Sequence, residues 1–444
     1  VHGLYPTMDW TPDSQQVVYW AGGKLWRVVI NTAERVNIPF QVSDSRDVYP
    51  VPRFAVDVAP KQFTTRMVRF AQASPSGDAL LFESLGRLYI KQGDAKPRPL
   101  TTDQTDGLDY SPVWSADGQQ IYFLRWDDQA LTSIRWVKAS GGRSKPLALQ
   151  QGQYTELSIS AEGTTLAYRK LAGSDFLTPD WGRKPGIYLL DIKTGESRFV
   201  SDRGQSPRLA ADGRVFVTDR KAAEGRGSSV AKTQLLSMTA DGFDVREVAE
   251  SEFATDLLVS PDGRYLAFIE NHHIYVSMLA KTGNTLTVGP RISDLPTKKL
   301  SGVGGSYLHW SADSASLSWS TGPTYKTVDV AAALFADAAP ADDDDGADND
   351  EAPTDVASSV PVPATVDLSQ VVVAAQPSGQ VAITGARLIT MDAERRVIEP
   401  GTILIDANRI VAVGAMAEIT IPEGAKRIDA AGKTIMPGLI DIHA

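Results

Sequence analysis

Cysteine is absent from this 444-residue chain, and histidine occurs only five times. Without cysteine the protein has no disulfide, no thiol nucleophile and no zinc site built from thiolates. No apolar run approaches the roughly eighteen residues that a membrane-spanning helix needs, so no integral membrane segment is expected. Residues 1–10 have neither a basic start nor an apolar core, and no signal peptide is recognised there.

Positive charge is also scarce. The chain has 44 Lys and Arg against 54 Asp and Glu, which gives a formal net charge of −10. Non-specific nucleic-acid binding requires a basic face, so no nucleic-acid partner is expected. The hydrophobic share of 42% and the charged share of 22% are ordinary for a globular protein. The length is sufficient for two or three domains.

A short turn sequence recurs seven times between residues 10 and 314. Each copy has an apolar or aromatic residue, then a small polar turn, then an alternating strand. The turns end at residues 14, 77, 118, 163, 213, 263 and 314. Gly suits a left-handed turn position, and a preceding Asp or Ser can bond the backbone of its own turn. Further short strands follow most turns, and four antiparallel strands in roughly 40 to 50 residues are typical of a β-propeller blade.

The turns at 114–118 (WSADG) and 260–263 (SPDG) resemble the repeat of TolB-like (WD40-like) propellers. This resemblance implies a mostly β fold with a propeller over residues 1–335. Seven units favour seven blades, and six to eight remain open because the first interval contains an irregular stretch at 40–70. The resemblance also favours a periplasmic or secreted location. It implies a protein partner or an oligomer formed through the propeller.

An acidic segment rich in Pro, Ala and Asp follows at 336–365. It has almost no large apolar residue, so it cannot bury enough surface to offset the entropy of ordering. We predict a disordered linker there. A calcium loop is excluded by spacing: with Gly346 at the sixth position, Ala341 and Ala352 occupy positions that require carboxylates.

Short strands are predicted again near the C-terminal end, at 381–391, 401–405, 408–414 and 426–430. Pro437 and Gly438 then turn the chain, and an apolar strand is predicted from Leu439. Alternation places Asp441 and His443 on the same side of that strand.

The sequences NRIVAVG (408–414) and GKTIMPGLIDIHA (432–444) resemble amidohydrolases of the imidazolonepropionase-like kind. This resemblance implies that residues 366–436 are an incomplete N-terminal β-sandwich. It implies that 437–444 are the first strand of a truncated (β/α)8 barrel. In this family the motif Pro-Gly-Leu-Ile-Asp-x-His-x-His supplies two metal ligands. His443 is therefore expected as the first ligand and Asp441 as the residue that orients it, while the second histidine would follow Ala444.

The resemblance implies hydrolysis of C–N bonds in a small-molecule or peptide-like amide, by water activated on a divalent metal, with zinc expected. No catalytic residue and no residue that binds an organic cofactor is expected within the 444 residues. The chain alone is expected to be inactive without the rest of the barrel. The alternative is a TolB-like protein-binding scaffold in the cell envelope.

The remaining histidines are predicted to be structural. His272 and His273 are adjacent and should face opposite sides of a strand, and His309 beside Trp310 is predicted to pack in a blade. The loops at Asp127-Asp128 and at 174–184 are predicted to lie between strands, and the second is a candidate contact surface. A prolyl-peptidase function is disfavoured because no Gly-x-Ser-x-Gly motif is present.

Overall fold

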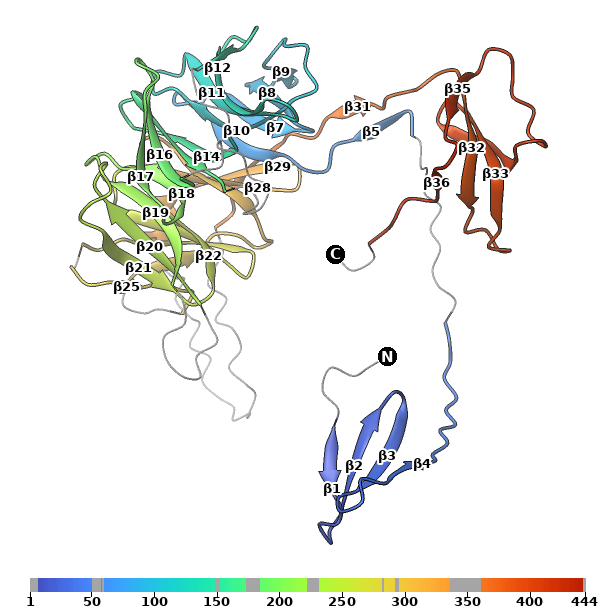
Figure 1. The fold of residues 1–444 in the computed structure, drawn as a ribbon. Helices are drawn as coiled ribbons and strands as arrows, with labels where there is room; N and C mark the ends of the chain where they lie inside the picture. The colour runs from blue at the N-terminus through green and yellow to red at the C-terminus, as the bar shows by residue number, and fades with distance from the viewer. Residues whose placement is uncertain are drawn as a thin grey trace, which may run out of the picture. The chain divides into compact units, whose positions relative to one another are not determined.

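The regular secondary structure of the described residues consists almost entirely of short, mainly antiparallel sheets (Figure 1). The structure is a computed structural model that describes residues 7–49, 57, 60–147, 152–172, 184–221, 231–281, 283–291, 295–335 and 361–441. These residues contain one short helix, α1 (Val330–Phe335). Two compact units are present, Val1–Val58 and Ala59–Ala444, and each is described by itself.

The first unit contains a four-stranded antiparallel meander. Its strands are β1 (Met8–Trp10), β2 (Gln16–Ala21), β3 (Lys24–Val29) and β4 (Arg35–Ile38). The meander has the strand order of a propeller blade, but none of its strand residues is buried. It therefore has no hydrophobic core of its own.

The second unit contains six further blades, each a meander of four strands in sequence order. The first blade is β6 (Arg69–Ala73), β7 (Ala79–Ser84), β8 (Arg87–Gln92) and β9 (Arg98–Pro99). The second is β10 (Leu108–Trp114), β11 (Gln120–Asp127), β12 (Leu131–Lys138) and β13 (Lys145–Pro146). The third is β14 (Tyr154–Ile159), β15 (Thr165–Lys170), β16 (Gly186–Asp191) and β17 (Ser197–Ser201).

The other three blades continue this order, with small additions. The fourth is β18 (Gln205–Leu209), β19 (Val215–Lys221), β20 (Lys232–Met238) and β21 (Arg246–Ser251), which pairs in parallel with β25 (Leu286–Thr287). The fifth is β22 (Ala254–Val259), β23 (Tyr265–Glu270), β24 (His273–Met278) and β26 (Thr297–Lys299). The sixth is β27 (Ser306–Trp310), β28 (Ser316–Thr321), β29 (Thr324–Asp329) and β30 (Ala364–Asp367).

Hydrophobic cores between successive blades close these six into a ring. The closing contact joins the sixth blade to the first, where Tyr325 and Leu368 pack with Ala71 and Phe82. Seven blades were favoured and six to eight were left open; within the described residues the ring holds six blades. The first repeat in chain order, at residues 8–38, belongs to the separate first unit.

The last strand of the ring comes from beyond the acidic segment. β30 pairs with β29 in the register Tyr325 to Val366, so residues 364–367 complete the sixth blade. The ring therefore extends past residue 335, where the sequence analysis ended it, and includes the end of the predicted 336–365 linker. Residues 361–363 of that linker have no regular secondary structure, and 336–360 lie outside the described residues.

The chain enters and leaves the ring at one place. β5 (Gln62–Thr64) pairs antiparallel with β31 (Val371–Val373), as Figure 1 shows. The backbone N–H of Thr65 also donates to the Gln370 carbonyl at 2.9 Å. Entry and exit strands therefore form a two-stranded ribbon next to the ring.

The predicted C-terminal strands form a single five-stranded sheet. β32 (Gln380–Ile389), β33 (Val397–Asp406) and β34 (Arg409–Ala415) are antiparallel, and β35 (Lys426–Asp429) and β36 (Thr434–Ile435) both run parallel to β32. The described residues show one sheet here, where a sandwich was predicted. Residues 437–441 belong to no strand, in contrast to the predicted strand from Leu439, and 442–444 lie outside the described part.

The repeated turns form as the sequence predicts. In the second blade Ser115 Oγ donates to Asp117 Oδ1 at 2.6 Å, and the Gly118 N–H donates to the Ser115 carbonyl at 2.9 Å. The seven turn ends all have a left-handed backbone: Ser14, Gly77, Gly118, Gly163, Gly213, Gly263 and Ser314. Glycine occupies five of these positions because it adopts positive φ without steric cost.

Candidate binding site in the propeller channel

The predicted metal site falls largely outside the described residues. His443 is among the residues not described, and Asp441 is exposed in a segment without regular secondary structure. Across the described ranges, no group of three or more His, Asp or Glu side chains is arranged to hold a metal ion. These residues by themselves therefore do not provide a ligand set. No helix in the same part of the chain is long and apolar enough to cross a membrane.

The other residues singled out from the sequence have local roles. Asp127 Oδ1 accepts hydrogen bonds from the N–H groups of Gln129 and Ala130, which stabilises the turn between β11 and β12. His273 Nδ1 lies 3.4 Å from Ser301 Oγ, and His272 is exposed at a turn. The candidate contact surface at 174–184 lies outside the described residues except for Lys184.

A cavity of about 1080 Å³ occupies the centre of the ring. The innermost strand of each blade contributes two consecutive residues just before its turn. The first residues of these six pairs are Gln72, Val113, Ser158, Arg208, Leu258 and His309. His309 was predicted to pack in a blade, and the structure corrects this because His309 lines the channel. The six residues at this repeat position include polar and charged side chains, and this is the sequence signal by which a channel position can be recognised.

The innermost strands share an irregularity that shapes this wall. Each has a register shift against the second strand of its blade. Five of them carry a left-handed residue two positions before the channel residue: Phe70, Ser111, Glu156, Ser206 and Tyr307. β-Bulges of this type change the direction of the side chains around them. The bulge is thus a repeated feature of the channel wall.

Arg208 is the charged side chain that the innermost strands contribute to the cavity wall, and two acids on the innermost strands of the neighbouring blades influence its charge. Arg208 comes from β18, Glu156 from β14 and Asp256 from β22, the innermost strands of three successive blades. Burial lowers the pKa of Arg208, and the attraction of Glu156 and Asp256 only partly opposes this. Burial raises the pKa of Asp256, although its side chain stays accessible to water. Burial also lowers the pKa of His309 to about 3, with the Arg208 charge adding to the effect, so His309 is neutral at pH 7.

The cavity extends outward between the first and sixth blades. Its wall there includes Leu80 and Lys91 of the first blade and Tyr325 of the sixth. Hydroxyl side chains make up much of the sixth-blade wall: Ser316, Ser318, Thr327 and Thr365. Small polar side chains fill less space than the aliphatic residues between the other blades. The closing interface of the ring therefore contains a cleft that is continuous with the channel.

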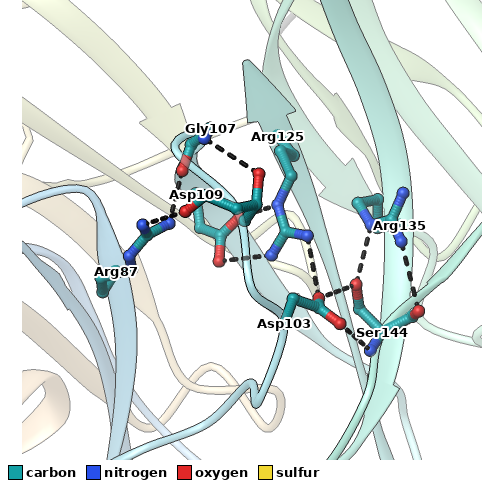
Figure 2. A network of polar contacts seen from close by, with 8 residues as sticks. Arg87, Asp103, Gly107, Asp109, Arg125, Arg135 and Ser144 are labelled. Carbon is teal, nitrogen blue, oxygen red and sulfur yellow. Dashed lines mark hydrogen bonds and ion pairs between the residues drawn. The ribbon is translucent and has the colours of Figure 1, made fainter. Parts of the chain in front are cut away.

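A separate polar network fixes the connection between the first two blades (Figure 2). Arg125 binds Asp109 through two hydrogen bonds of 2.5 and 2.9 Å, and it binds Asp103 at 2.8 Å. Asp109 is fully buried. Burial alone would raise the pKa of Asp103, but hydrogen bonds from Ser144 and Arg125 outweigh it and hold the pKa below its usual value. All of these groups are satisfied within the protein, so we assign the network a structural role.

Comparison with known proteins gives partial likenesses. No family model matches the chain. Over 61 residues the chain is 38% identical to the 5-methylthioadenosine/S-adenosylhomocysteine deaminase of Symbiobacterium thermophilum. That match covers 14% of this chain and 14% of the deaminase. The chain thus spans a small part of the curated relative that it matches.

The ring is similar to several solved β-propeller structures. TolB from Acinetobacter baumannii is 14% identical with a TM-score of 0.40, over 73% of this chain and 76% of that chain. An oligogalacturonate lyase solved with manganese is 11% identical with a TM-score of 0.40, over 70% and 83%. The assignment of six blades rests on the strand order and the interblade cores of this chain.

Proposed function

We propose that this chain is part of a metal-dependent hydrolase that cleaves C–N bonds in a small-molecule or peptide-like amide. The observation that carries the proposal is the 38% identity over 61 residues to a protein named as a deaminase. Deamination by water is itself the hydrolysis of a C–N bond. The sheet from β32 to β36, followed by Pro437 and Gly438, supports the same family resemblance.

We propose zinc as the metal, with His443 as a ligand and Asp441 as the residue that orients it. A divalent metal in such a site would supply a water of lowered pKa. The described residues alone do not hold a metal. Further ligands are therefore required beyond them, and no described residue is given a catalytic role.

The test uses the natural gene product that contains this chain. Zinc content by mass spectrometry and ammonia release from amides and aminopurines would be measured for the wild type and three variants. We expect His443→Ala to lose bound zinc and turnover. Asp441→Asn should weaken zinc binding about 10- to 100-fold. His272→Asn is the matched control, because His272 is exposed in a turn, and it should retain both properties. Retention of zinc and turnover by His443→Ala would refute the proposal.

The second candidate function is a protein-binding scaffold in the periplasm or outside the cell. The open channel and the cleft between the first and sixth blades favour it. A scaffold would keep its partner when His443 is replaced, whereas a hydrolase would lose turnover. The same set of variants therefore separates the two functions.

A further inference from the structure

The four-stranded meander of the first unit is apolar on both of its faces. Cross-strand pairing places Tyr19 beside Trp26 on one face, which also carries Trp10. Alternation along β2 places Val18 and Trp20 on the opposite face. None of the strand residues is buried, and Trp10 is 57% exposed. A sheet with one solvated face alternates apolar and polar residues, so this pattern is typical of a sheet that is covered on both faces.

The ring shows what covers such faces, because its blades have the same alternation. In β11 of the second blade, Ile121 and Phe123 pack in a core shared with the first blade. Tyr122 and Leu124 of the same strand pack in a core shared with the third blade. Each side of a blade is therefore covered by a neighbouring blade of the same repeat.

The repeated turn relates the meander of the first unit to these blades. Residues 10–14 repeat the turn at 114–118, and the second strand starts two residues after each turn. Val17 and Tyr19 therefore occupy the positions that face the preceding blade in the ring. The alternate residues of β2 occupy the positions that face the following blade. The meander thus has the contact residues for a blade on each side.

Trp10 is the residue that a blade uses to contact the blade before it. The equivalent Trp310 donates its indole N–H to the Leu258 carbonyl of the preceding blade at 3.1 Å. The equivalent Trp114 packs in the core shared with the first blade and is 7% exposed. An indole at this position is therefore buried where a preceding blade is present, and the exposure of Trp10 marks a face that lacks this neighbour.

The ring of the second unit is closed without this meander. Tyr325 of the sixth blade and Leu368 pack on Phe82 of the first blade, and all three are buried. The face that the first blade turns towards its predecessor is thus covered by the sixth blade. Blades of the ring follow one another in chain order, and the chain after residue 38 leads into this closed ring. A blade that precedes the meander is therefore expected earlier in the natural chain.

We propose that residues 8–38 are the last blade of a second propeller, whose other blades lie N-terminal to Val1 in the natural protein. The preceding blade of that propeller covers the face of Trp10 and Tyr19. Its first blade covers the face of Val18 and Trp20, as the first blade covers the sixth in the ring described above. Both partner surfaces are sheets that present aliphatic and aromatic side chains. The inference does not depend on the proposed hydrolase function.

Hydrogen exchange followed by mass spectrometry tests this inference on two proteins, the natural gene product and the 444-residue chain. We expect the amides of β2 and β3 to exchange at least about 100-fold more slowly in the natural gene product, because neighbouring blades protect them there. The amides of β11 are the internal reference and should exchange equally in both proteins. Equal exchange of β2 and β3 in the two proteins, whether fast or slow, would overturn the inference.

Variants of the natural gene product test each face separately. Trp10→Asp and Trp20→Asp each place a charge in one of the two proposed interfaces, and each should speed the exchange of β3 at least about tenfold. Glu34→Gln is the matched control, because Glu34 is exposed between β3 and β4, and it should leave this exchange unchanged. Unchanged exchange of β3 in either tryptophan variant would contradict the proposed neighbour on that face.

Photo-cross-linking identifies the neighbour directly. Trp10→p-benzoylphenylalanine keeps an aromatic side chain at this position of the natural gene product. We expect intramolecular cross-links to peptides N-terminal to Val1, mapped by mass spectrometry. Cross-links to residues 59–444 or to a second polypeptide in their place, or no cross-link at all, would overturn the inference.

Discussion

At the scale of single residues, His309 shows how the channel changes the chemistry of a side chain. It lies one position before Trp310, whose indole N–H donates to the Leu258 carbonyl at 3.1 Å and fixes β27 against β22. The backbone is therefore held where the imidazole faces the channel and is partly buried. The neutral imidazole is the stable form there, because the charged form would be poorly hydrated and would lie close to the positive charge of Arg208.

Stability should therefore depend on pH through His309. In the unfolded chain a histidine takes up a proton below about pH 6.5, whereas folded His309 does so only near pH 3. Its contribution to stability is complete above pH 6.5 and is lost as the pH falls towards 3. We expect the wild type to lose up to about 2 kcal/mol more than His309→Gln between pH 7 and pH 5. Urea unfolding at both pH values measures this, with His272→Asn as control. Equal losses in wild type and His309→Gln would contradict the prediction.

At the scale of elements, the connection from β9 to β10 depends on buried charge. Arg87 donates to the carbonyls of Thr105 and Gly107, and Arg125 holds Asp103 and Asp109 on either side of them (Figure 2). This segment has few apolar residues to anchor it. Ion pairs thus hold the segment that connects the first blade to the second.

Removal of one partner of the Arg125–Asp109 ion pair should lower the free energy of unfolding. Asp109→Asn leaves the Arg125 guanidinium buried without its bidentate acid, and we expect a loss of about 3–5 kcal/mol in the free energy of unfolding. Asp241→Asn is the matched control, because the Asp241 side chain is 70% exposed and pairs with Arg198. Its loss should be about 0–1 kcal/mol. Denaturant unfolding monitored by circular dichroism compares the two, and similar losses would argue against a structural role for the network.

Elements with local signals were predictable from sequence, and elements with distant partners were not. The serine, aspartate and glycine of each turn bond within a few residues, so Ser115 to Gly118 was recognised as a turn and is confirmed. β30 has four residues, and its partner β29 precedes it by more than thirty residues. No periodic pattern reports such a pairing. His309 was misassigned because it was judged from its own repeat, and only comparison with the polar residues at the same position of other blades, such as Arg208, marks a position that faces the centre.

At the scale of the whole molecule, the number of blades in the ring is set by which blades pack on each other, and the number of sequence repeats does not reveal this. Seven repeats are present, but the sixth blade packs on the first through Tyr325 and Ala71, which closes the ring without residues 8–38. The predicted metal residues His443 and Asp441 remain a prediction, since the described residues do not test them.

The ring should tolerate replacement of the acidic segment. From beyond it the ring needs β30 and the buried Leu368 that follows, and β30 starts opposite Thr327, close to where α1 begins. A Gly/Ser linker of twelve residues spans about 19 Å. Replacement of residues 337–360 by this linker should therefore change Tm by less than about 4 °C. Thermal melting measures this. Substitution of Val366 by Lys places a charge in the closing core and should lower Tm clearly more. A large fall with the linker alone would show that the segment stabilises the ring.

The ribbon of β5 and β31 has a mechanical consequence. Gln62 lies opposite Val373, so the two chain segments outside the ring depart from the same end of the ribbon. A force that pulls these segments apart breaks the hydrogen bonds of the ribbon one pair after another, whereas a shearing force would act on all of them at once. The ribbon should therefore separate before the blades unfold.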